Sequence, residues 1–385
     1  MSLGKDFTID FVVDRDLISH GFRKYKGPGD SYYIDCPFCG KKRKVGISSL
    51  RGVGKCNYCG EGFNKISLHA KLRGITNLEA GRELNDIFRG LSEEDRQLYL
   101  KKVNDTENYQ EPAPIEIRDA VYRGLLSLLS LSEEHEQDLK ERGLTEKQMH
   151  EGMYKTFPSA ERAEIGRKLR DFIPNDMPHG YGIPGLYDLF AEDGPKLVKR
   201  KNGYLIPVRN DTGKISALQI RFDTLSEDAP DEERERFKRY AWLSSSEKKT
   251  GCSVSGCENI HFAGDWRSIP ETVVITEGAL KADVAAALSR KHTGFLGLTG
   301  VNNLSQLPGV MAWLKQYDAV KRIFIAVDMD CREKKEVWKA LQAIEDIVRS
   351  SGFPYEIAEW DGRYKGIDDF MLANRNFRKL TSKQE

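Results

Sequence analysis

The chain has 385 residues, of which 31% are charged and 39% hydrophobic, and its mean hydropathy is −0.55. This length and composition indicate a water-soluble globular protein of two or three domains, and they exclude a membrane protein because no apolar run approaches the roughly 20 residues of a membrane span. The formal net charge of +1 excludes a uniformly basic chain, so any nucleic-acid-binding surface has to be local.

The N-terminal part contains two Cys-x-x-Cys pairs, Cys36 with Cys39 and Cys56 with Cys59, separated by sixteen residues. Each pair presents two thiolates from a tight turn, and two pairs at this distance complete a tetrahedron, so the spacing predicts a structural Zn²⁺ site. The alternative is four free or redox-active cysteines. Paired cysteines of this kind fit a reducing compartment, and the first residues lack the apolar core of a signal peptide, so a cytoplasmic protein is expected.

The same part of the chain is basic. Residues 1–75 contain 14 Lys and Arg against 7 Asp and Glu, and the turn after the first cysteine pair is Lys41-Lys42-Arg43-Lys44. A basic zinc ribbon with aromatic side chains suits a nucleic-acid strand, through phosphate contacts and base stacking. The alternative is a solvated charged loop.

Residues 91–115 are charged and end in a Pro-rich stretch, which predicts a linker or a helix followed by a linker. A helical pattern resumes at Ile115. Gly143 and Thr145 then predict the end of one helix and the start of the next.

Two strands are predicted at 202–209 and 214–222, joined by a turn at 210–213 whose Asn-Asp-Thr-Gly sequence suits a hairpin.

Further along, short β-branched runs at 272–276 and 322–327 show no polar alternation, as is typical of strands buried on both faces of a parallel sheet. Between them lie an Ala-rich helical pattern at 279–288 and an apolar run at 294–298. The order is β-α-β-β, and ligands of open α/β sheets bind at the carboxyl ends of the strands.

Carboxylates follow these strands at the expected edge. Glu277 ends the first run, and Asp328 and Asp330 follow the last one. Three carboxylates repel one another unless a hard cation lies among them, and Mg²⁺ prefers oxygen ligands, so the arrangement predicts a site for metal-assisted phosphoryl chemistry. The alternative is a pair of surface aspartates that cap the following helix.

These acidic motifs carry a family resemblance. Glu277-Gly278, Asp328-x-Asp330 and the Gly-Ile-Asp-Asp sequence that contains Asp368 resemble a Toprim domain, the catalytic fold of DnaG-type primases, topoisomerases and some nucleases. The rest of the chain resembles the DnaG-type primases: a Cys-Pro-x-Cys zinc ribbon, a Leu-x-x-Arg-Gly-Leu-Thr motif at 139–145, and a basic strand pair before the Toprim motifs.

The resemblance implies a multidomain α+β and α/β protein with an N-terminal zinc ribbon and a primase core that contains a Rossmann-like parallel sheet. The expected domains are a zinc-binding domain at 1–90, a linker at 91–115, the first part of the catalytic core at 116–270, a Toprim domain at 271–375 and a tail at 376–385.

The implied activity is metal-dependent ribonucleotidyl transfer, in which a nucleotidyltransferase makes short RNA primers on single-stranded DNA. Ribonucleoside triphosphates are the substrates, Mg²⁺ or Mn²⁺ is the catalytic cofactor, and a replicative helicase acts in trans, since the chain has no Gly-x-x-x-x-Gly-Lys-(Ser/Thr) motif. The all-cysteine zinc motif points to a phage or mobile-element type. The implied catalytic residues are Glu277, Asp328 and Asp330, with Asp368 as a further metal ligand, and the implied nucleic-acid or nucleotide contacts are Arg209, Arg221, Arg239, Lys281, Lys41, Lys42, Arg43 and Lys44.

The chain departs from the family at Lys281, where these Toprim domains usually have Asp, and at Asp368-Asp369, where an Asp-x-Asp motif is usual. A single metal site is therefore expected, and Lys281 is expected either to contact a phosphate or to pair with the carboxylates. The alternative for each arginine of the strand pair is a strand-edge residue in a surface ion pair. Two other functions stay open, a Toprim nuclease and a non-catalytic zinc-plus-Toprim recombination mediator that binds DNA.

Overall fold

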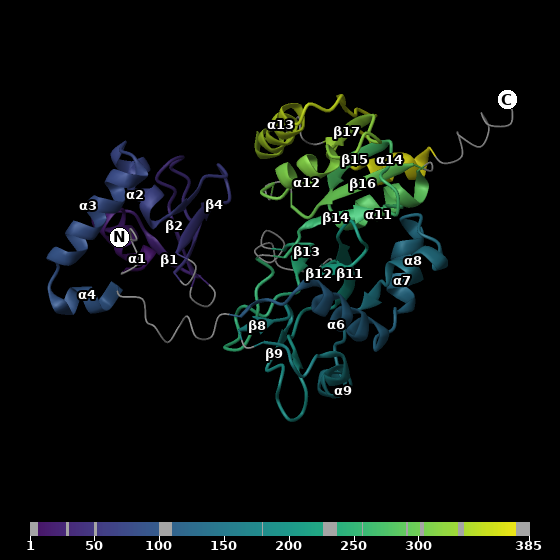
Figure 1. The fold of residues 1–385 in the computed structure, drawn as a ribbon, viewed down its shortest axis with the longest axis horizontal. Coiled ribbons are helices and arrows are strands. Elements are labelled where there is room, and N and C mark those ends of the chain that lie inside the picture. Colours follow the sequence, from purple (N-terminus) through teal and green to yellow (C-terminus); the bar gives the residue numbers. More distant parts are fainter. Residues whose placement is uncertain are drawn as a thin grey trace. The chain divides into compact units, whose positions relative to one another are not determined.

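The computed structural model describes residues 7–27, 31–49, 52–99, 110–178, 180–225, 237–255, 257–289, 292–300, 304–329 and 335–374. The chain divides into two compact units, Met1–Tyr109 and Gln110–Glu385 (Figure 1). Within the described ranges, no helix is long and apolar enough to cross a membrane.

The first unit is a five-stranded antiparallel sheet, in chain order, with helices before and after it. Its elements are α1 (Ile9–Asp16), η1 (Ile18–His20), β1 (Lys24–Lys26), β2 (Ser31–Ile34), β3 (Val45–Ser48), β4 (Val53–Cys56), β5 (Gly62–Asn64), α2 (Lys65–Arg73), α3 (Asn77–Gly90) and α4 (Glu93–Tyr99).

Local sequence fixes where these elements begin. Asn64 and Thr76 each form a capping box at the start of α2 and α3, in which the cap side chain accepts a backbone N–H of the first turn. One face of the sheet carries apolar side chains, among them Ile34, Val45 and Phe63, which pack with α1, α2 and α3 into a core.

The second unit begins with a mixed region of helices and short strands. Its elements are β6 (Glu111–Pro112), α6 (Ile115–Ser127), α7 (Glu133–Glu141), α8 (Glu146–Gly152), β7 (Lys155–Thr156), α9 (Arg162–Leu169), η2 (Arg170–Phe172), β8 (Tyr181–Gly182), β9 (Leu186–Tyr187), β10 (Lys196–Leu197), β11 (Gly203–Arg209), β12 (Ile215–Phe222) and β13 (Tyr240–Trp242). Strands β7, β11, β12 and β13 form an antiparallel sheet in the order β13-β12-β11-β7.

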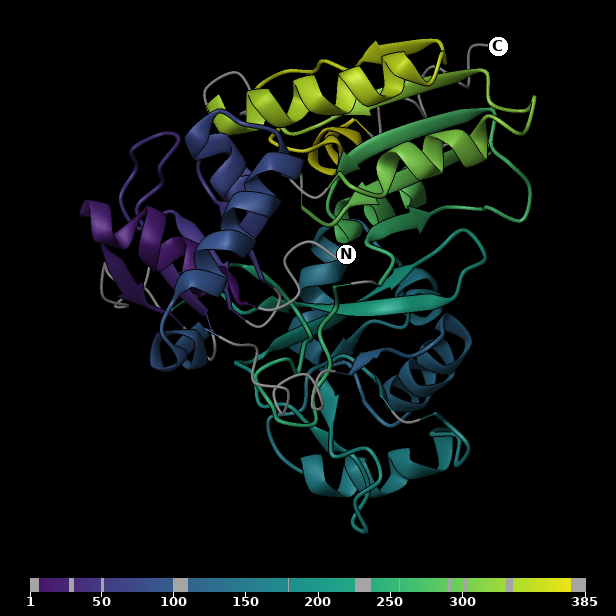
Figure 2. The same ribbon diagram turned by 60° about the vertical axis from the view of Figure 1, so that its left-hand side comes forward.

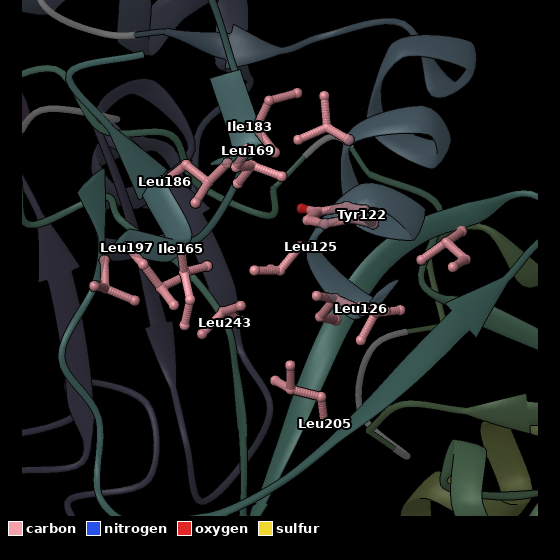
Figure 3. Close-up of a cluster of buried hydrophobic side chains, with 14 of the residues drawn as sticks. Tyr122, Leu125, Leu126, Ile165, Leu169, Ile183, Leu186, Leu197, Leu205 and Leu243 are labelled. Carbon is pink, nitrogen blue, oxygen red and sulfur yellow. The ribbon is translucent and has the colours of Figure 1, made fainter. Parts of the chain in front are cut away.

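The predicted hairpin is confirmed as β11 and β12, and the predicted helix boundary is confirmed because Gly143 adopts a φ of 99° after α7 and Thr145 caps α8. Helix α6 packs its apolar side onto β12 (Figure 3). There Tyr122, Leu125 and Leu126 meet side chains from the β8–β10 region and from β11, and the Tyr122 hydroxyl donates to the Pro184 carbonyl oxygen at 3.0 Å.

The rest of the second unit is a five-stranded sheet in the order β14-β16-β15-β17-β18. Strands β15, β16, β17 and β18 are parallel, and β14 runs antiparallel to β16. The elements are β14 (Ile260–Ala263), β15 (Thr272–Glu277), α11 (Ala279–Leu288), β16 (Thr293–Leu298), α12 (Leu307–Leu314), β17 (Arg322–Ala326), α13 (Lys335–Ser350), β18 (Tyr355–Ile357) and α14 (Ile367–Ala373).

Helices cover both faces of this sheet, so its strands are apolar on both sides. Val273 and Ile275 point to the face covered by α12 and α13, whereas Val274 points to the face covered by α11 and α14. Figure 2 shows α13 as the long yellow-green helix beside these strands. The predicted class, α+β followed by a Rossmann-like parallel sheet, is confirmed.

Helix α4 agrees with the expected helix followed by a linker at 91–115, and the segment also contains strand β6; residues 100–109 and the expected tail at 376–385 lie outside the described ranges. One feature differs from the expected domain boundaries. Strand β14 belongs to the parallel sheet although it precedes residue 271. A short strand behind a Cys- and Ser-rich loop has too few residues to show its partner in the sequence.

Candidate functional site

The four cysteines of the first unit come together as predicted. Their Sγ atoms all lie within 4.8 Å of one another, with 3.8 Å between Cys36 and Cys59 and 3.9 Å between Cys39 and Cys56. Four thiolates around a zinc ion with Zn–S bonds of about 2.3 Å stand about 3.8 Å apart at the corners of a tetrahedron. The donor set and its spacing therefore fit a closed, structural zinc site.

Two glycines make the turns of this site. Gly40 and Gly60 follow the second cysteine of each pair with φ of 69° and 77°, and their N–H groups donate to the carbonyl oxygens of Cys36 and Cys56. A side chain rarely adopts this left-handed conformation, so glycine at these positions lets each pair fold back as a knuckle.

A hollow of about 690 Å³ lies beside strands β2 to β5, lined by Tyr33, Gly46 and Lys55 together with apolar residues such as Val53 and Phe63. A Cβ atom at Gly46 would lie 3.6 Å from the ring of Tyr33, which is half-buried. The Arg43 guanidinium lies 6.0 Å from the centre of the same ring. The predicted basic residues Lys41, Lys42, Arg43 and Lys44 are all exposed.

Three of the predicted carboxylates belong to segments at the carboxyl edge of the parallel sheet. Glu277 is the last residue of β15, Asp328 follows β17 by two residues, and Asp368 lies in the first turn of α14. Asp328 and Asp368 are each 3% exposed. Asp330 lies outside the described residues. Gly278, with a φ of 85°, turns the chain sharply from Glu277 into α11.

Lys281 lies among these carboxylates, one turn of α11 after Glu277. Its ammonium forms an ion pair with Asp328 Oδ1. Burial alone would lower the pKa of Lys281, but Asp328 and, less strongly, Glu277 and Asp368 raise it, so the ammonium stays charged at neutral pH. Of the two expectations for Lys281, the structure shows the pairing with the carboxylates.

Asp368 has an unusual environment for a carboxylate. Burial and the neighbouring Asp369 raise its pKa, and within the described structure its Oδ1 atom has no hydrogen-bond partner. A buried carboxylate oxygen with no partner costs free energy, and such an atom fits a cation-binding role. Among the described residues only the four cysteines gather their ligand atoms within 4.8 Å, so the three carboxylates do not all lie that close together.

Sequence reasoning did not single out Lys365, which precedes α14. Its Nζ atom lies 3.5 Å from Asp328 Oδ2, and its side chain is 62% exposed. The only sequence signal was its place directly before the Gly-Ile-Asp-Asp motif.

The predicted arginines of the strand pair are engaged inside the protein. Arg221 is 5% exposed and donates from Nη1 to Asp138 Oδ2 at 2.9 Å. Arg209 donates from Nη2 to the Gly152 carbonyl oxygen at the end of α8, at 2.8 Å. These contacts indicate a structural role for Arg209 and Arg221, although inside the protein and not in the surface ion pairs that the alternative expected. Arg239 is half-buried and donates to the Thr224 hydroxyl at 2.7 Å.

A second buried network joins the four-stranded antiparallel sheet to the five-stranded sheet. The Arg209 N–H donates to His261 Nδ1 at 3.0 Å, so Nε2 carries the hydrogen of the neutral ring and donates to Asp283 Oδ1 at 2.9 Å. The Tyr154 hydroxyl donates to Asp283 Oδ2. Asp283 lies two residues after Lys281 in α11, and its carboxylate contacts His261 of β14.

Comparison with known proteins gives one family model and one curated relative. The model of a domain of unknown function, DUF3854, matches residues 266–377. Over 368 residues the chain is 23% identical to the DNA primase of Clostridium acetobutylicum, covering 93% of this chain and 54% of that primase.

This chain is similar to DNA primases. The resemblance predicted from the motifs is thereby confirmed, and the matched region includes both the cysteine site and the carboxylate edge. The chain spans about half the length of the curated primase that it matches.

Two solved structures are also similar. The zinc-binding and RNA polymerase domains of the Aquifex aeolicus primase match with a TM-score of 0.47 and 18% identity, covering 97% of this chain and 85% of that one. The primase fragment of the bacteriophage T7 primase-helicase protein matches with a TM-score of 0.35 and 11% identity, covering 93% of this chain and 99% of the fragment.

Proposed function

We propose that this protein is a DNA primase, a nucleotidyltransferase that condenses ribonucleoside triphosphates into short RNA primers on a single-stranded DNA template. One observation carries the proposal: a single continuous match to a DNA primase extends over 93% of the chain. A nuclease or a recombination mediator would account for the carboxylates or the zinc site, but neither accounts for the whole match.

The carboxylate edge is the proposed catalytic centre. Glu277, Asp328, Asp330 and Asp368 are the proposed ligands of Mg²⁺ or Mn²⁺, and the unpartnered Oδ1 of Asp368 supports this assignment. A bound divalent ion would supply stabilisation of the charge that develops on the transferred phosphoryl group. Glu277 at the end of β15, Asp328 after β17 and Asp368 in α14 would hold the ion at the sheet edge.

The first unit is the proposed template-binding unit. Its exposed Lys41, Lys42, Arg43 and Lys44 and the half-buried Tyr33 ring offer phosphate contacts and a stacking surface for single-stranded DNA. Arg239 stays a proposed contact of the triphosphates. A replicative helicase in trans is the proposed partner, and the reduced cysteine site supports a cytoplasmic location.

The test is incorporation of labelled ribonucleotides on single-stranded DNA with Mg²⁺ or Mn²⁺. Wild type should make short oligoribonucleotides, and Glu277→Gln and Asp328→Asn should each lower the yield at least a hundredfold. Glu271→Gln is the matched control, because Glu271 is exposed and directly precedes the opposite end of β15. It should leave the yield unchanged.

Two results would contradict the proposal. Metal-dependent cleavage of DNA by wild type but not by Glu277→Gln, without any synthesis, would favour the nuclease. DNA binding with neither reaction would favour the mediator.

A further inference from the structure

The acidic cluster of the parallel sheet contains its own cation. We propose that the Lys281 ammonium occupies the place of one cation among Glu277, Asp328 and Asp368, so that the cluster takes a single divalent ion. This inference rests on the proposed metal site of the carboxylates.

The position of Lys281 follows from the elements that hold it. Gly278 turns the chain from β15 into α11, and Lys281 stands on the first turn of that helix, facing the next strand of the sheet. Its ammonium pairs with Asp328, whose side chain is 4% exposed, and its own side chain is 22% exposed. A buried aspartate at a sheet edge requires a positive charge beside it, and here a lysine of the same chain provides that charge.

The other side of the cluster is packed closely around Lys281. A Cβ atom at Gly366 would lie 2.3 Å from Asp368 Oδ1 and 3.3 Å from Lys281 Cδ. The Asp368 oxygen and the Lys281 stem therefore both lie beside Gly366, and the oxygen has no hydrogen-bond partner among the described residues. Asp368 is 3% exposed, so this oxygen is the one buried acceptor of the described cluster that the lysine leaves for an added ion.

Lys281 and Lys365 both lie beside Asp328 but differ in exposure, so substitutions of the two lysines make a matched test and control. Lys281 contacts Oδ1 from inside the cluster, whereas Lys365 stands 3.5 Å from Oδ2 with its side chain 62% exposed. Water screens the exposed charge far more than the buried one. Removing either lysine changes the net charge equally, but only the removal of Lys281 should open a cation position.

The experiment is Mn²⁺ titration of the full chain with its cysteine site loaded with zinc, followed by calorimetry and by the electron paramagnetic resonance signal of free Mn²⁺. Wild type should bind one Mn²⁺ at the carboxylates, and Glu277→Gln should abolish this binding. Lys281→Met should bind Mn²⁺ at least tenfold more tightly than wild type. Lys365→Met should differ from wild type by less than threefold, and Lys281→Arg should resemble wild type.

A Lys281→Met protein that binds Mn²⁺ as wild type does, or more weakly, would overturn the inference while leaving the metal site intact. A wild-type titration identical to that of Glu277→Gln would instead remove the metal site itself, and the inference with it. If Lys281→Met does not fold without metal, Mn²⁺ should restore its folding. Failure of that rescue would also overturn it.

Discussion

Arg221 of the antiparallel sheet forms a structural ion pair with Asp138 inside the protein. The Arg221 guanidinium lies 5.4 Å from the centre of the Tyr204 ring, and the Tyr204 hydroxyl donates to the same Asp138 oxygen that Arg221 contacts. Asp138 also accepts from Arg142 at the end of α7. This cluster ties α7 to the antiparallel sheet.

We expect Asp138→Ala to destabilise the second unit by about 2 kcal/mol, because it leaves the buried Arg221 without its carboxylate. This loss of stability is smaller than that of breaking a fully buried ion pair, because the Asp138 side chain is 33% exposed. Urea unfolding of the full chain measures it. Asp265→Ala is the control, since it breaks an ion pair whose partner Arg267 is 91% exposed, and it should leave the urea midpoint unchanged. Equal midpoint shifts in the two variants would contradict a structural role for Arg221.

The same carboxylate gives a pH dependence. Burial alone would raise the pKa of Asp138, but Arg142 and Arg221 hold it below its usual value. The unfolded chain therefore binds a proton more readily than the folded one, so this contribution is present above the ordinary aspartate pKa of about 3.9 and is lost as the pH falls through the lowered folded pKa. Thermal unfolding between pH 6 and pH 3 should show a steeper loss for wild type than for Asp138→Asn. Parallel profiles would exclude Asp138 as a source of the acid sensitivity.

At the scale of elements, Gly278 makes the turn between β15 and α11. Its φ of 85° is unfavourable for other residues, although a Cβ atom there would meet no atom within 4 Å. We expect Gly278→Ala to destabilise the protein by about 1–2 kcal/mol through backbone strain alone, and to weaken Mn²⁺ binding because Glu277 moves. Calorimetric unfolding and the Mn²⁺ titration measure the two effects.

Gly309 in α12 offers the matched control. Its position is also open, but it lies within a helix, where alanine is favoured over glycine by about 1 kcal/mol. Gly309→Ala should therefore stabilise the protein without changing Mn²⁺ binding. The same sign for both substitutions would contradict the assignment of strain to the turn at Gly278.

Local patterns made these elements predictable. The apolar runs at β15 and β17, the Ala-rich α11 and the Asn-Asp-Thr-Gly turn all depend on neighbouring residues, and the structure confirms each. The spacing of the two cysteine pairs likewise predicted that the four thiols gather at one site, as the structure shows. Contacts between residues far apart in the sequence could not be predicted. Nothing near Arg221 indicates Asp138, 83 residues earlier, and nothing near Lys281 decides between a phosphate and Asp328.

At the scale of the whole molecule, charge is distributed unevenly along the chain. The net charge is +1, whereas residues 1–75 contain 14 basic and 7 acidic residues, so the remainder carries −6. Single-stranded DNA should therefore be attracted mainly by the first unit, and its binding should weaken with salt by about 0.7 logarithmic units per phosphate contact and decade of salt.

We expect Lys41→Gln with Lys42→Gln to reduce that salt slope by about 1. Fluorescence anisotropy of a labelled oligonucleotide between 50 and 300 mM salt measures it. Lys147→Gln with Lys168→Gln removes the same charge from exposed helix positions of the second unit and should leave the slope unchanged. Equal slopes in the two double variants would show that the overall charge, rather than the zinc-ribbon turn, governs binding.

Strand β14 sets a boundary for dissecting this protein. It pairs with β16 at the edge of the parallel sheet, yet it precedes the residues matched by the family model. A fragment that starts at residue 266 would leave the β14-facing backbone groups of β16 bare at residues 295–298, and a bare apolar strand edge pairs readily with other molecules. Such a fragment is expected to aggregate on expression, whereas one that includes Ile260 keeps the edge covered.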